Sequence, residues 1–190
     1  MPKIRRLARS CAFTFVALGV TATTLAVAPA NAVDNDAQHR SGAVALNDTQ
    51  VAEHDKNQEA RRLRAARQFE SRIISAKQNA LSQRGDAYAW GAVGPNAFDC
   101  SGLIVFSYGQ AGFHLPRTSG AQAAFTHRIA KQDMRPGDLM FFSAGGAVYH
   151  AGIFLGYQHG RAMMVHAPGS GSRVTVAAAW TSNWFGGTLR

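Results

Sequence analysis

The stretch FDCSGLIVFSYGQAG, residues 98–112, decides how this chain is expected to fold. Asp99 is a residue type favoured at a helix N-cap, because its carboxylate accepts a hydrogen bond from a backbone N–H of the first turn. The apolar run behind it predicts a helix over about residues 100–111. Cys100 would lie in the first turn, where N–H groups and the helix dipole favour a thiolate and can bind an oxyanion. Gly102 leaves room for a substrate backbone.

Cys100 is one of two cysteines in the 190-residue chain, and the other, Cys11, lies in an N-terminal apolar run. Four Lys and Arg precede that run, and Ala30-Asn31-Ala32 follows it as a small-x-small cleavage site. Residues 1–32 are therefore predicted to be a secretory signal peptide. Its removal would leave Cys100 unpaired in an oxidising compartment, where a lone thiol is either a buried apolar group or a reactive one.

The chain is basic, with a formal net charge of +9. Without the predicted signal peptide, 16 Lys and Arg face 11 Asp and Glu, which gives +5. Residues 71–190 carry ten of these basic residues and four of the acidic ones. Such a domain suits an anionic surface such as a bacterial cell wall. No basic run is interleaved with aromatic residues, so nucleic acid is not an expected partner.

The region before residue 71 is predicted to be an extension and not part of the catalytic domain. Residues 33–50 are polar and aperiodic, which is typical of a disordered leader. Residues 51–84 contain no Pro or Gly and favour a helix, and one apolar stripe recurs at helical spacing: Ala66, Phe69, Ile73, Ala76 and Ala80. We expect its last turns to pack on the domain and its first turns to be solvated; the alternative is that residues 51–70 dock over the active site.

Residues 71–190 are predicted to form one domain in which helices precede strands. Helices are expected at 71–84, 100–111 and 118–124. Short apolar runs bounded by Gly, Pro or Ser predict strands at 139–142, 151–155, 162–165 and 173–176. Helices followed by consecutive strands indicate an α+β fold, with N-terminal helices packed on a central antiparallel sheet.

Two histidines are placed to work with the cysteine. His150 and His166 are symmetric about Gln158, and residues 157–161 read as a hairpin turn. A hairpin centred there would place the two imidazoles opposite each other on one face of the sheet. One ring could then act as a base and the other could orient it. Zinc binding is the competing chemistry, but CxxC and HExxH spacings are absent, and neither a metal nor another cofactor is expected.

Five segments, in the same order along the chain, resemble the NlpC/P60 family of cell-wall peptidases. They are AYAWG with the following GP and FDCSGL (residues 87–103), LPRTSGAQ (115–122), RPGDLMFF (135–142), YHAGIFLG (149–156) and MVHA (164–167). The resemblance spans about residues 71–180. Gly91-Ala92 departs from the Gly-Gly that the family often has after its Trp.

The resemblance implies a papain-like fold and a secreted peptidoglycan hydrolase. The expected reaction is cleavage of peptide stems, usually between D-glutamate and a diamino acid such as meso-diaminopimelate. Matched by position, Cys100 is the nucleophile, His150 the base and His166 the orienting third member. Four residues are expected to contact the substrate. Tyr88 matches the family's active-site tyrosine, near the thiol and the oxyanion, and three others match positions that commonly line the substrate groove: Asp99, Ser101 and Arg117. The alternatives are a non-catalytic wall-binding module and a muramoyl–L-alanine amidase on the same fold.

Overall fold

The computed structural model of the chain describes residues 47–190. The predicted signal peptide, residues 1–32, and the leader as far as residue 46 lie outside the described residues. The elements, in chain order, are α1 (Asp48–Ser82), β1 (Ala87–Tyr88), β2 (Ala97–Phe98), α2 (Cys100–Gln110), α3 (Ser119–Phe125), β3 (His127–Ile129), the 3-10 turn η1 (Lys131–Asp133), β4 (Leu139–Ala144), β5 (Ala147–Gln158), β6 (Arg161–His166), β7 (Thr175–Ala178) and β8 (Trp184–Thr188).

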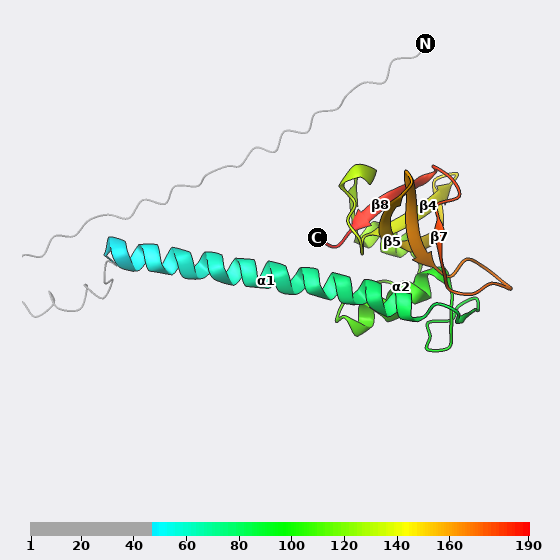
Figure 1. The fold of residues 1–190 in the computed structure, drawn as a ribbon, viewed down its shortest axis with the longest axis horizontal. Helices are drawn as coiled ribbons and strands as arrows, with labels where there is room; N and C mark the ends of the chain where they lie inside the picture. Colours follow the sequence, from blue (N-terminus) through cyan, green and yellow to red (C-terminus); the bar gives the residue numbers. More distant parts are fainter. Residues whose placement is uncertain (1–46) are drawn as a thin grey trace, which may run out of the picture. The chain divides into compact units, whose positions relative to one another are not determined.

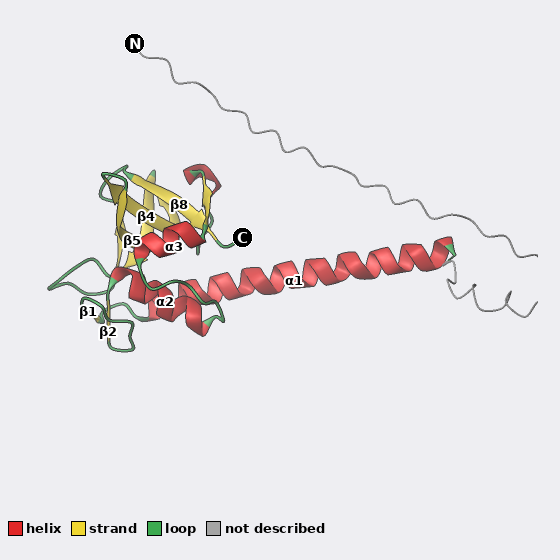
Figure 2. Cartoon of the chain, turned by 180° about the vertical axis from the view of Figure 1, so that it is seen from behind, coloured by secondary structure: helices red, strands yellow, loops and turns green. Residues whose placement is uncertain are grey.

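Six of the strands form one antiparallel sheet in the order β3-β8-β4-β5-β6-β7, and β1 pairs with β2 in parallel. Figure 2 shows α1 and α2 together beside this sheet. The arrangement confirms the predicted α+β fold with helices before an antiparallel sheet. Short strands β3 and β8 were not expected from the sequence. They extend the sheet beyond β4. In β8 the residues that pair with β3 and β4 include Gly186 and Gly187, which have no side chains, so the sequence shows no alternating pattern of apolar residues there.

Alternation along the strands divides the buried residues into two layers. One layer packs the helices against the sheet and includes Ile73, Leu103, Tyr108, Phe141, Ile153 and Val165. The other layer lies on the opposite sheet face and consists of Met134, Met140, Phe142, Phe154, Ala162, Met164 and Trp184. Both histidines belong to strands β5 and β6, at even positions that share this second face.

Helix α1 is anchored only through its last turns (Figure 1). Asn47 caps its start in a capping box with Gln50. Side chains from 51 to 68 are exposed apart from a half-buried Ala60, whereas Ile73 and two alanines further along are buried. This confirms that the first turns are solvated and the last turns pack on the domain. The predicted domain start, residue 71, falls inside the helix, and no helix within 47–190 is long and apolar enough to cross a membrane.

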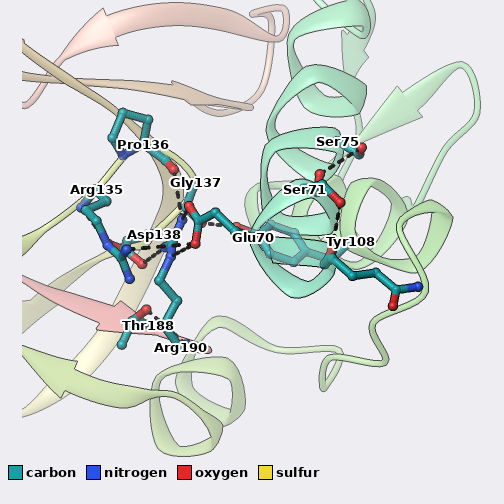
Figure 3. Close-up of polar contacts among 11 residues, drawn as sticks. Glu70, Ser71, Ser75, Tyr108, Arg135, Pro136, Gly137, Asp138, Thr188 and Arg190 are labelled. Atoms are coloured by element: carbon teal, nitrogen blue, oxygen red, sulfur yellow. Dashed lines mark hydrogen bonds and ion pairs between the residues drawn. The ribbon is translucent and has the colours of Figure 1, made fainter. Parts of the chain in front are cut away.

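A cluster of ion pairs, with Arg190 and Asp138 buried and Glu70 partly exposed, fixes the anchored part of α1 (Figure 3). Arg190, the last residue, donates to both carboxylate oxygens of Glu70 on α1 at 2.8 and 2.7 Å. It also pairs with Asp138, which is buried at the start of β4 and accepts the N–H of Arg135. Arg190 thus joins the helix, the C-terminal segment and the central strand, which holds the helical layer in register with the sheet.

The β5–β6 hairpin differs from the predicted one. Its turn consists of two residues, His159 and Gly160, both with positive φ, so the strands continue closer to the turn than expected. Ile153 pairs with Val165, which places Gly152, and not His150, opposite His166. The expectation that the two histidines are direct partners is therefore wrong. They are offset by two residues on one face.

Candidate active site

Cys100 begins α2, and Asp99 caps this helix as the sequence predicts. Gly102 N donates to Asp99 Oδ1 at 2.6 Å. The N–H group of Cys100 has no backbone oxygen acceptor among residues 47–190, so it can bind a developing oxyanion. The expectation for Gly102 is wrong, because a Cβ there would lie 2.0 Å from the carbonyl oxygen of Ala92. This glycine accommodates the chain's own loop and not a substrate backbone.

Arg117 is held against the start of α2. It donates to Asp99 Oδ1 and Oδ2 at 3.1 and 2.5 Å and to the Ser101 hydroxyl at 2.9 Å, and Asp99 Oδ2 also accepts the N–H of Gly91. Burial acts to raise the pKa of Asp99, but the bonds from Arg117 and from two backbone N–H groups outweigh it, so this pKa is lowered. Asp99 therefore stays ionised and fixes the loop, the helix and Arg117 as one unit.

The position of Cys100 at the start of a helix predicts a stabilised thiolate with a lowered pKa, but the structure gives the opposite shift. Burial raises the pKa of Cys100, and the Asp99 carboxylate adds to this rise. Hydrogen bonds from the N–H of Ala151 and from the N–H and hydroxyl of Ser101 oppose it without reversing it. The resting group is a thiol, and a thiolate forms only on proton transfer to a base. The bond from Ala151 places the sulfur against β5 at the residue after His150.

The two histidines form a hydrogen-bonded pair. His150 Nε2 lies 2.9 Å from His166 Nδ1, with the rings at 86° to each other. The other nitrogen of His150, Nδ1, has no hydrogen-bond partner within residues 47–190 and is not sealed from solvent, so it can accept a proton. A base acting at Nδ1 carries its own proton on Nε2 and donates it to His166. The hydrogen bond lets His166 orient the ring of His150, which is the role of the third member of a catalytic triad.

Trp180 covers this pair and was not identified from the sequence. Its ring stacks on Phe142 with centroids 4.2 Å apart and lies 5.2 Å from His150 and 5.8 Å from His166. Nε2 of His166 is buried without a partner among residues 47–190. A tryptophan in an irregular segment between two strands gives no periodic signal, so only its contacts mark it as part of the site.

Burial strongly favours the neutral form of both rings. It lowers the pKa of His150 to about 3, with a smaller effect of the charge on His166, and lowers the pKa of His166 to about 4. At neutral pH the site thus holds a thiol and two neutral imidazoles. A neutral imidazole has an unprotonated ring nitrogen, which is the group that could accept the thiol proton.

These lowered values predict acid sensitivity. Below pH 6.5 the unfolded chain takes up protons on His150 and His166 that the folded chain refuses, so the free energy of unfolding falls as the pH drops from about 6.5 towards 4. Between pH 7 and pH 5 we expect a loss of up to about 2 kcal/mol for each histidine. Urea unfolding at the two pH values measures it. A variant with both histidines replaced by glutamine should lose most of the difference, and equal wild-type stabilities would contradict the burial argument.

A groove of about 310 Å³ opens beside the thiol. It is lined by Trp90, Gly91, Asp99, Cys100, Ser101, Arg117, Thr118, Ser119 and Tyr149. Three of the four predicted substrate-contacting residues thus line it together with Cys100. Tyr88, the fourth, lies outside this lining but close to the sulfur: burial and then the charge of Cys100 raise the pKa of Tyr88. No residue of α1 lines the groove, and within residues 47–190 no cluster of three or more His, Cys, Asp or Glu side chains could hold a metal ion.

A cysteine at the start of a helix, together with a histidine pair on the adjacent strands β5 and β6, defines a papain-like α+β scaffold. Residues 85–189 match the NlpC/P60 family, and this chain belongs to that family. Its similarity to the probable endopeptidase p60 of Listeria monocytogenes is 49% identity over 84 residues, which cover 44% of this chain and 17% of that protein. The chain therefore spans about a sixth of that relative's length.

Two solved structures from Mycobacterium tuberculosis share the fold. The peptidoglycan hydrolase RipB aligns with a TM-score of 0.55 and 26% identity over 63% of this chain and 65% of its own. RipD, described as a non-catalytic NlpC/p60 domain protein adapted to peptidoglycan binding, aligns with a TM-score of 0.53 and 28% identity over 63% of this chain and 98% of its own. Within the family, the fold alone thus does not separate hydrolysis from binding.

Proposed function

We propose that this chain is a secreted cysteine endopeptidase that cleaves peptide stems of peptidoglycan, at the bond between D-glutamate and meso-diaminopimelate. The observation that carries the proposal is the hydrogen bond between His150 and His166 on the strands next to the Cys100 thiol. Membership of the NlpC/P60 family supports the substrate class, and residues 1–32 support export.

The reaction begins when His150 takes the proton of Cys100 and the thiolate attacks the amide carbon. The N–H group of Cys100, at the start of α2, stabilises the oxyanion. His150 then gives its proton to the leaving amine, and water hydrolyses the thioester. Because the thiol is neutral at rest, its proton must move to His150 for the sulfur to attack. His150 is then an imidazolium, which His166 stabilises through the hydrogen bond between the two rings.

Two other functions use the same scaffold. A non-catalytic wall-binding module is favoured by the likeness to RipD, and a muramoyl–L-alanine amidase would apply the same chemistry to another amide. The presence of a cysteine and two paired histidines supports catalysis over binding alone.

The test is digestion of purified peptidoglycan by the full chain, with mass spectrometry of the soluble products. We expect fragments whose new amino terminus is the diamino acid. Free sugar chains with an intact released stem would identify an amidase instead. Binding to the wall without any released product would identify the non-catalytic module.

A further inference from the structure

A second hollow lies on the sheet face that carries the histidine pair. It has a volume of about 370 Å³, and three aromatic and two cationic side chains contribute to its lining: Lys131, Tyr157, Arg161, Trp180 and Trp184. It is separate from the groove beside Cys100, since the two share no residue. The proposed reaction does not use it.

The aromatic side chains present firm surfaces to this hollow. Trp180 is 51% exposed although its ring stacks on Phe142, so part of the indole surface is fixed and open to solvent. Tyr157 is 48% exposed, and its hydroxyl donates to the carbonyl of Lys131 at 2.9 Å. Exposed aromatic rings that are already ordered lose little conformational entropy when they bind a ligand.

The charge of the hollow is positive and unbalanced. Lys131 Nζ lies 4.3 Å over the ring of Trp184 and donates to the carbonyl of Ser182 at 2.7 Å, which fixes its position. Arg161 is exposed and makes no side-chain hydrogen bond or ion pair with residues 47–190. No Asp or Glu contributes to the lining. Such a set of groups fits a ligand with an anionic group, and a free guanidinium binds a carboxylate through two parallel hydrogen bonds.

Trp180 connects the hollow to the chemistry, because the same ring lies against His150 and His166. In the proposed reaction His150 protonates the leaving amine, so the amine-bearing half of the substrate must lie on the side of His150. The groove with Asp99 and Arg117 lies on the side of Cys100. A substrate that spans both sites therefore passes from that groove across Trp180 into the hollow.

We propose that this hollow binds a carboxylate on the amine-bearing half of the cleaved stem, with Arg161 as its principal partner and Trp180 as the surface over which that half lies. The proposal rests on the proposed function, since the reaction assigns the leaving half to this side. It also makes the enzyme discriminate between stems that differ only in the charge of that half.

The experiment compares two synthetic stem peptides that differ at one group on the residue after the scissile bond, a free carboxylate in one and a carboxamide in the other. For the wild-type chain we expect kcat/KM to be about tenfold higher for the carboxylate, as one exposed charge-assisted contact allows. In Arg161→Gln this ratio should fall to about twofold or less. Arg84→Gln, which removes an exposed arginine outside the hollow, should retain the wild-type ratio. An unchanged ratio in Arg161→Gln would overturn the proposal.

A binding measurement separates this inference from the proposed function. In the Cys100→Ala chain, calorimetry with the same two peptides should give a Kd about tenfold lower for the carboxylate, and this preference should vanish when Arg161→Gln is added. If wild type cleaves neither peptide but the binding preference holds, the endopeptidase proposal fails and the carboxylate site stands. If cleavage occurs and both peptides bind equally, the carboxylate site is wrong and the endopeptidase proposal stands.

Discussion

Replacing Cys100 with alanine is expected to lower kcat on peptidoglycan stems by about 10⁵-fold, because residues 47–190 contain no other cysteine that could form the thioester. Only the oxyanion donor and substrate binding would remain. The fold should persist, since the Cys100 side chain is small and half-buried and alanine is well tolerated in a helix. Product release from a defined muropeptide, followed by mass spectrometry, measures the effect, and the melting temperature reports the fold.

The matched control is Gln110→Ala, which alters an exposed residue in the last turn of the same helix and should leave the rate unchanged. Labelling with iodoacetamide adds a second readout. Because burial raises the pKa of Cys100, we expect labelling to be slow at neutral pH and to accelerate as the pH rises. Full activity in Cys100→Ala would refute the nucleophile and, with it, the cysteine mechanism.

Replacing His150 with glutamine should lower kcat by about 10²- to 10⁴-fold, the range expected when a general acid–base is removed. Glutamine keeps a polar group that can reach His166, so the loss would reflect proton transfer more than packing. The pH dependence of kcat is the measurement that identifies the role. The variant should recover rate as the pH rises and the thiol ionises without a base, whereas wild type gains little from this.

His114→Gln is the control, because that histidine is exposed and lies outside the site. His166→Gln should also lose activity, since without it the ring of His150 is not held in the tautomer that accepts at Nδ1. The two site variants should nevertheless differ in the effect of pH, because only one of them lacks the base. A His150→Gln chain that works normally beside an inactive His166→Gln chain would exchange the two roles.

The start of the catalytic helix could be predicted from sequence because its determinants are local. An Asp at the N-cap, an apolar run behind it and a cysteine in the first turn specify the helix and the position of the thiol within a few residues. The long helix before it and the central strands were predicted for the same reason, since periodicity and Gly or Pro boundaries reflect local backbone preferences. The order of helices and strands then indicated the α+β class.

Local sequence patterns could not predict how the two histidines come to lie on the same face of the sheet. From the two-residue turn at 159–160, His150 is eight residues back along β5 and His166 is five residues forward along β6, which would place them on opposite faces of a regular ladder. A bulge at Leu155, next to Gly156 with φ of 126°, removes one step from β5 and restores a common face. The sequence-based prediction reached the right face through the wrong register.

The sequence by itself determined which residue types are available and where the thiol begins its helix, because caps, turns and periodicity act between neighbours in the chain. Only the tertiary structure decided the protonation state of the Cys100 thiol and which side chains contact the two histidines. Burial raises the pKa of Cys100 against the helix dipole, and Trp180 reaches the pair from a distant segment. Desolvation and long-range packing depend on every element around a group, so no local pattern specifies them.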